Sequence, residues 1–354
     1  MNEIERAKIK DIKHKVTAMI AERAGFKDGD STAVSPSDYW AEVCSSFDYM
    51  LGLPEEYFSK LRIHAYHITG DSYLHYDDHR NPQVFRTQVN LDGMTKDIPP
   101  EMILNEPSDG IGFSYEDGRF VNIDVLRYQR VVNTLYRRGI LSDLSSPEPQ
   151  QRNSILEIGG GYGGLAHHLS NILGNAVYVI VDLPETLLFS AAYLSLHNPD
   201  KKVYVYNSDD FSEFIDAGGA GSYDFILMPN YMLESLTHWR FKIAINMISF
   251  QEMNSQQVNE YLDFIRDNGV GQLYSWNMDS HVLDTDLPTM ASLLEGRFEF
   301  EEVGEPEKPD SRSRRLRDGL KSIASTLGIT DPPPRGISLG HYVYRGHEYL
   351  CRPI

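Results

Sequence analysis

A cluster of glycines in the middle of the chain constrains the fold more than any other feature of the sequence. Residues 157–164 read EIGGGYGG, directly after the compact apolar run 154–158 and directly before a helical pattern at 165–173. Glycines let the backbone turn sharply and approach a ligand closely, and the start of a helix adds free amide donors. A strand, a glycine turn and a helix in this order predict the first unit of a nucleotide-binding parallel sheet.

A second acidic residue narrows the choice of nucleotide ligand. The β-rich run 177–181 ends at Asp182, 19 residues after Gly163. An acid at this spacing is placed to accept both ribose hydroxyls of an adenosine. A dinucleotide site normally has Gly-x-Gly-x-x-Gly, whereas these glycines alternate and follow Glu157. An acid there suits a cationic amino group rather than a diphosphate, so we expect S-adenosyl-L-methionine as the cofactor and not NAD.

The C-terminal half alternates strands and helices, which predicts an α/β, Rossmann-like parallel sheet with helices on both faces. Further strand candidates lie at 203–207, 224–228, 242–250 and 271–276, and helix candidates at 185–198 and 254–269. We expect three parts. They are a mainly helical N-terminal cap and substrate lid at 1–150, the cofactor-binding domain at 151–305, and a basic segment with C-terminal edge strands at 306–354.

The N-terminal part is predicted to be helical at 1–25, with Ile4, Ile12, Val16, Met19 and Ile20 on one apolar face. That face either packs on its own domain or forms the contact of a homodimer. Residues 64–124 are long, polar and aromatic, and such loops are often functional, so we expect them to close over the cofactor. Asp124 is predicted to cap a helix that ends near Gly139.

Charge and composition exclude several classes of partner. The chain has 33 Lys and Arg against 51 Asp and Glu, a net charge of −18, which disfavours a nucleic-acid substrate. It has two cysteines and no apolar run as long as the roughly 20 residues that a membrane helix needs. The N-terminal residues also lack a secretory pattern. We therefore expect a cytoplasmic protein with a small-molecule acceptor and no membrane.

The motifs also resemble a known family. ILEIGGGYGGLAHHL followed by VIVDLPE is similar to the class I S-adenosylmethionine-dependent methyltransferases. The segments NEPSDGIGF, GRFVNIDVLRYQRV, INMISFQEMN and LYSWN resemble a bacterial family of sugar O-methyltransferases, over about residues 60–280. The resemblance implies methyl transfer to a hydroxyl of a sugar or glycosylated small metabolite.

It also implies roles for individual residues. Gly159, Gly161 and Gly163 would cradle the methionine portion, Asp182 would hold the ribose and Leu183 would pack on the adenine. The adenine amino group would be met by Asp209, or by Asn230 if the third strand is 224–228 rather than 203–207. Tyr128 would cover the carboxylate end of the cofactor.

A hydroxyl acceptor needs a base beyond the carboxyl ends of the strands. Glu252 and His281 are the candidates, although Glu252 also suits a first-turn helix acid and His281 a solvated loop. We expect Asn105, Glu106 and Asn277 at the acceptor. The loop His75 to His79 offers metal ligands, but we expect no metal there.

Other functions stay open at this point. The same cofactor can serve an amine, a carboxylate or a peptide acceptor, or can be bound without catalysis. An exocyclic base amine is disfavoured, because Pro229-Asn230-Tyr231 is not the Asn/Asp-Pro-Pro-Tyr motif of such enzymes.

Overall fold

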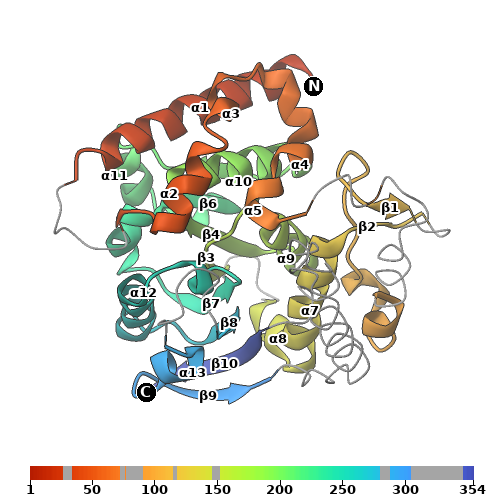
Figure 1. Cartoon of the computed structure of the whole chain (residues 1–354), viewed down its shortest axis with the longest axis vertical. Helices are drawn as coiled ribbons and strands as arrows, with labels where there is room; N and C mark the ends of the chain where they lie inside the picture. Colours follow the sequence, from red (N-terminus) through yellow and green to blue (C-terminus); the bar gives the residue numbers. More distant parts are fainter. Residues whose placement is uncertain are drawn as a thin grey trace, which may run out of the picture.

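The computed structural model describes residues 1–26, 34–71, 76, 91–114, 118–145, 152–279, 288–303 and 346–354. Within them the protein is built on an eight-stranded sheet of order β5-β6-β4-β3-β7-β8-β10-β9 (Figure 1). The strands are β3 (Asn153–Ile158), β4 (Ala176–Asp182), β5 (Val203–Val205), β6 (Phe225–Pro229), β7 (Phe241–Met247), β8 (Leu273–Asn277), β9 (Phe298–Glu302) and β10 (His347–Pro353). Neighbours from β5 to β8 pair in parallel, so the predicted α/β Rossmann-like fold is confirmed.

Helices cover this sheet because its central strands are apolar on both faces. The helix α9 (Gly164–Leu173) packs on β4, and α10 (Pro184–His197) packs on β5 and β6. The amphipathic helix α12 (Ser255–Asp267) begins with the predicted cap, a capping box formed by Asn254 and Gln257. Shorter elements are α11 (Phe211–Asp216), η5 (Gly219–Gly221), η6 (Asn230–Leu236), η7 (Phe250–Glu252) and α13 (Met290–Leu294).

The long helix α1 (Glu3–Arg23) packs along α10 on the outside of the sheet (Figure 1). Its buried face carries Ile9, Ile12, Val16 and Met19, whereas Ile4, expected on that face, is exposed. The face is therefore occupied within the chain and is not free to contact a second copy. This packing also explains why α10 is buried on nearly every side.

The rest of the N-terminal part is made of short elements. They are α2 (Asp38–Ser45), α3 (Tyr49–Gly52), η2 (Glu55–Lys60), α4 (Leu61–His64), α5 (Tyr66–Thr69), η4 (Pro100–Met102), β1 (Phe113–Ser114), β2 (Phe120–Val121), α7 (Ile123–Arg137) and α8 (Ile140–Leu144). The predicted cap of α7 was wrong: Asn122 accepts the hydrogen bond of Val125 N, and Asp124 lies in the first turn. No helix among the residues that the structure describes is long and apolar enough to cross a membrane.

The C-terminal strand β10 is antiparallel to its neighbours, but it does not lie at the edge, where the strands of 306–354 were expected. It pairs with β8 on one side and with β9 on the other. The edge strand β9, at residues 298–302, has no counterpart in the sequence prediction. The last residues of the chain thus complete the same sheet that begins at β3.

A buried ion network fastens the N-terminal cap to the glycine loop. Arg62 Nε donates to Glu106 Oε1 at 2.8 Å and its Nη2 donates to Asp124 Oδ2 at 2.7 Å. The same guanidinium lies 4.0 Å from the centre of the Tyr162 ring in the glycine loop. All three charged side chains are at most 2% exposed. Removing the cation would leave two buried carboxylates short of their countercharge.

We therefore expect Arg62→Ala to lower the free energy of unfolding by about 3–5 kcal/mol. The matched control is Arg138→Ala, which breaks the exposed pair between Arg138 and Glu301 and should cost less than about 1 kcal/mol. Urea unfolding followed by circular dichroism measures both. Equal, small losses in the two variants would show that Arg62 does not hold the cap.

Candidate active site

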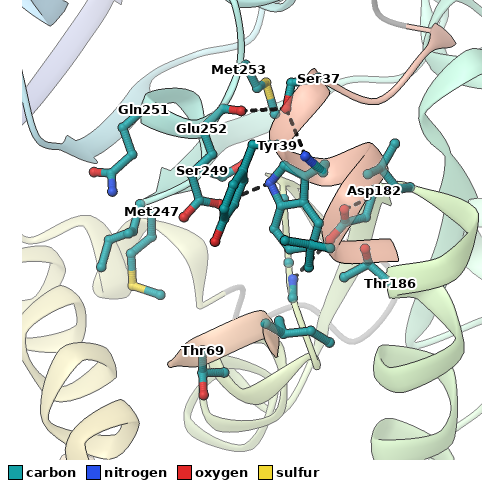
Figure 2. Close-up of a pocket in the computed structure, with 18 of the residues that line it drawn as sticks. Ser37, Tyr39, Thr69, Asp182, Thr186, Met247, Ser249, Gln251, Glu252 and Met253 are labelled. Carbon is teal, nitrogen blue, oxygen red and sulfur yellow. Dashed lines mark hydrogen bonds between the residues drawn. The ribbon is translucent and has the colours of Figure 1, made fainter. Parts of the chain in front are cut away.

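A cavity of about 570 Å³ lies at the carboxyl ends of five strands. Glu157, Asp182, Asn230, Met247 and Met278, at or just after the ends of β3, β4, β6, β7 and β8, all line it. The N-terminal cap closes the other side with residues from 35–43 and 66–70 and from α7. Figure 2 shows Ser37, Tyr39 and Thr69 from the cap around the same space as Asp182 and Glu252. Its size is typical of a small-molecule site, and its place is the crevice where open α/β sheets bind ligands.

The glycine loop forms one wall of this cavity. Gly159 has a φ of +76°, and a Cβ there would lie 2.0 Å from Ser249 Oγ, so only glycine lets this loop meet the turn after β7. The amide of Gly161 donates to Asp182 Oδ2 at 3.0 Å, which ties the loop to β4. Gly163 does not line the cavity: it precedes α9 with a φ of +86°, and a Cβ there would lie 3.2 Å from Leu194. Its expected place beside the methionine is therefore corrected, because it packs α9 against α10.

Glu157 is the least satisfied charged group of the site. The side chain is 1% exposed, and its Oε2 has no hydrogen-bond partner in the described part of the chain. Burial raises the pKa of this carboxyl to about 8, and the Tyr178 hydroxyl beside it only partly opposes that shift. A buried carboxyl group without a partner favours a cationic ligand, which would supply the missing charge.

Asp182 lies at the end of β4 on the same wall. Its two oxygens accept the amides of Gly161 and Leu183, at 3.0 and 2.8 Å. Burial raises its pKa to about 7, although these two amides oppose the shift. Leu183 lines the cavity beside it.

The strand next to β4 is β6, and β5 lies outside β6. Of the two third-strand alternatives, the one at 224–228 therefore brings its end to the cavity, and Asn230 lines it. Asp209 follows the outer strand and does not line the cavity, so that alternative was wrong. The adjacent Asp210 instead accepts the hydroxyl of Tyr204 at 2.9 Å.

Glu252 lies at the end of η7 and lines the cavity, next to residues of the cap (Figure 2). Its Oε2 accepts Trp40 Nε1–H at 3.1 Å, and its carbonyl oxygen accepts Ser37 Oγ–H at 2.8 Å. Burial raises the pKa of the Glu252 carboxyl to about 8 against the opposing bond from Trp40. Glu252 is therefore a carboxyl group held in the cavity by one donor and poised near neutral pH.

The turn that carries Glu252 is strained. Ile248 has a φ of +60°, which is rare for a β-branched residue, and its amide donates to Trp276 O at 2.7 Å. This backbone turns Ser249 towards the glycine loop and begins η7. Strain of this kind is commonly held at functional sites, where the surrounding structure enforces it.

Three residues expected at the acceptor do not line the cavity that the described residues form. Asn105 accepts the amide of Phe120, and Glu106 pairs with Arg62. Asn277 is buried and donates to Asn246 Oδ1 at 2.9 Å. Each of the three side chains has at least one partner inside the protein, and the structure does not bring them to the cavity.

Two expected positions cannot be placed. His281 lies outside the described residues, as does the loop His75 to His79 except for Tyr76. Tyr76 donates to Asp71, and no group of three His, Cys, Asp or Glu side chains among the residues described could hold a metal ion.

The sequence predicted a cap over the cofactor but did not identify most of the cap residues that line the cavity. Ser37, Tyr39, Trp40 and Thr69 line the cavity, as does Arg127 from α7 next to the expected Tyr128. Tyr39 and Trp40, two adjacent aromatic residues at the start of a short helix, were a weak signal of a ligand-binding surface. Nothing in the local sequence, however, indicates that this helix faces the ends of strands two hundred residues later.

Searches for relatives found no family model and no curated protein that matches this chain. Distant likenesses exist among solved structures. The CurJ carbon methyltransferase is 12% identical with a TM-score of 0.32, over 98% of this chain and 91% of that one. The plantazolicin methyltransferase BpumL, solved with SAH, is 12% identical with a TM-score of 0.32, over 89% and 99%. A phosphoethanolamine N-methyltransferase of Haemonchus contortus, solved with S-adenosyl-L-methionine, is 12% identical with a TM-score of 0.34, over 62% and 52%.

The raised pKa of Glu157 predicts how the stability of the folded protein changes with pH. Its ordinary value is 4.5 and its value in the folded protein is about 8, so the folded state binds the proton more tightly. The stability from this group is present below about pH 4.5 and is lost as the pH rises to about 8. Each such group contributes a slope of at most about 1.4 kcal/mol per pH unit.

We expect Glu157→Gln to flatten the fall in the free energy of unfolding of the free protein between pH 5 and 8. Glu213→Gln, on the exposed side of α11, should leave the slope as in the wild type. Urea unfolding at several pH values gives both slopes. A wild-type slope in Glu157→Gln would mean that this carboxyl is not buried in its neutral form.

Proposed function

We propose that this protein is an S-adenosylmethionine-dependent O-methyltransferase that acts on a hydroxyl of a sugar or glycosylated small metabolite. The observation that carries the proposal is the buried Glu157 carboxyl, whose Oε2 has no hydrogen-bond partner among the described residues, beside a glycine loop at the end of the first strand of the parallel sheet. S-adenosylmethionine bears a sulfonium and an α-ammonium group. A cavity with this buried acid fits such a cation better than it fits a diphosphate.

We assign different residues that line the cavity to different parts of that cofactor. Glu157 would pair with the α-ammonium group and Asp182 with the ribose hydroxyls. Leu183 and Asn230 would contact the face and the edge of the adenine. Tyr128 also lines the cavity and would contact the methionine portion.

The bound cofactor supplies an activated methyl group, so the protein has to align the acceptor and remove its proton. We assign the removal of that proton to Glu252, a carboxyl group that lines the cavity after the end of β7. It works as a base only in its ionised form, and a pKa of about 8 makes it a stronger base than an ordinary carboxylate. The bond from Trp40 orients the carboxyl, and Tyr39 and Trp40 offer flat apolar surfaces of the kind that sugar rings contact.

The cofactor assignment is tested by titration calorimetry. The protein should bind S-adenosylmethionine and S-adenosylhomocysteine and should not bind NAD detectably. Asp182→Ala should weaken S-adenosylhomocysteine by about 1–3 kcal/mol, the cost of losing charge-assisted hydrogen bonds. Tighter binding of NAD than of S-adenosylhomocysteine would overturn the assignment.

The reaction is tested with methyl-labelled S-adenosylmethionine and a panel of sugars and glycosides, with mass spectrometry for products heavier by one methyl group. With an acceptor so found, Glu252→Gln should lower turnover by about 10²–10⁴-fold and leave S-adenosylhomocysteine affinity nearly unchanged. Glu295→Gln, an exposed acid after α13, should leave turnover as in the wild type. Near-normal turnover of Glu252→Gln would place the base elsewhere, and label on nitrogen would contradict the hydroxyl acceptor.

A further inference from the structure

Arg127 is a charged residue of the cavity that the proposed reaction leaves without a role. It lies in the second turn of α7 and lines the cavity beside Tyr128. Of the cavity-lining residues that the structure describes, it is the only arginine or lysine. Its side chain is 10% exposed, so its charge is largely removed from water.

One half of this guanidinium is fixed by the protein. Nη1 donates to Thr69 O at 3.0 Å and to Asp124 Oδ1 at 2.9 Å. Asp124 is in turn held by Arg62, so the aspartate sits between two arginines. These bonds fix the plane of the Arg127 side chain and join it to α5 of the cap.

The other half has no hydrogen-bond partner among the residues that the structure describes. Nε is buried and has no hydrogen-bond partner in the described part of the chain, and Nη2 donates to none of the described residues. The N–H bonds of Nε and Nη2 lie parallel along one edge of a guanidinium. Such an edge receives a carboxylate through two parallel hydrogen bonds. An unmet pair of charged donors next to a cavity costs free energy unless a ligand satisfies it.

We propose that the Nε–Nη2 edge of Arg127 binds a carboxylate group in this cavity. The inference rests on the proposed function, because that function supplies two sources of such a group. One is the α-carboxylate of the cofactor, whose ammonium group would face Glu157. The other is a carboxylate on the acceptor, as in a uronic acid, close to Glu252.

The test compares two nucleosides. S-adenosylhomocysteine carries the carboxylate, whereas 5′-methylthioadenosine has the same adenosine and thioether without the amino-acid group. Calorimetry measures both affinities for the wild type and for Arg127→Gln and Arg127→Lys. The control is Arg137→Gln, which removes an exposed arginine from the end of the same helix. In a second arm, saturation-transfer NMR compares glucuronate with glucose on the free protein and on the S-adenosylhomocysteine complex.

If the cofactor supplies the carboxylate, Arg127→Gln should bind S-adenosylhomocysteine about 10- to 100-fold more weakly and 5′-methylthioadenosine as the wild type does. Arg127→Lys keeps the charge without the fork and should lie between. If the acceptor supplies the carboxylate, the nucleoside affinities should stay unchanged in both variants. The wild type should then bind glucuronate in preference to glucose, and both variants should lose this preference. Unchanged binding in both arms overturns the proposal.

Two further outcomes are decisive. Should Arg127→Gln lose 5′-methylthioadenosine binding through misfolding, Arg127→Lys decides by the same criteria. A wild-type protein that binds neither nucleoside contradicts the proposed cofactor, and glucuronate binding to the free protein then decides for or against Arg127 by itself.

Discussion

The site depends on a buried carboxyl group, one oxygen of which has no hydrogen-bond partner among the described residues. Glu157 ends the central strand β3, where the parallel sheet brings five strand ends together. Its burial keeps the group neutral near pH 7 when no ligand is present. The same burial means that a cation placed beside it gains an interaction that water cannot screen. The glycine loop that follows can meet the turn after β7 only because Gly159 has no Cβ, which would lie 2.0 Å from Ser249 Oγ.

The N-terminal cap is part of this site rather than an attachment to it. The helix α1 covers α10, and Arg62 joins α4 to α7 within the cap and contacts Tyr162 of the glycine loop. From this anchored position the cap supplies Trp40 to the carboxyl of Glu252 and the Thr69 carbonyl to Arg127. The same charged cluster that stabilises the cap therefore also orients groups that face the ligand.

Much of the fold could be predicted, because it follows from local sequence patterns. Apolar runs separated by capped helices identify a parallel sheet, and the glycine loop with Asp182 identifies its ligand-binding end. The position of β10 could not be predicted, because its pairing with β8 and β9 depends on contacts between distant residues.

The site itself was predictable only in part. Glu157, Gly159, Gly161, Asp182 and Glu252 lie at the ends of strands or soon after them, and the ends of parallel strands converge. Asn105, Glu106 and Asn277 look like ligand contacts by their polarity, but each bonds to another group of the protein. Polarity alone does not distinguish these two uses. Gly163 belongs to the same motif as the other glycines, yet the space that its missing Cβ leaves is filled by side chains of α10.

The central claim, that Glu157 meets the ammonium group of the ligand, predicts a proton release. At pH 7 the Glu157 carboxyl is mostly protonated, and a neighbouring cation would lower its pKa, so it should lose its proton on binding. Calorimetry of S-adenosylhomocysteine binding in buffers of different ionisation enthalpy measures the protons released. The account predicts a release approaching one proton for the wild type and a clear reduction of that release in Glu157→Gln. Equal release by the two proteins, or none by the wild type, would contradict it.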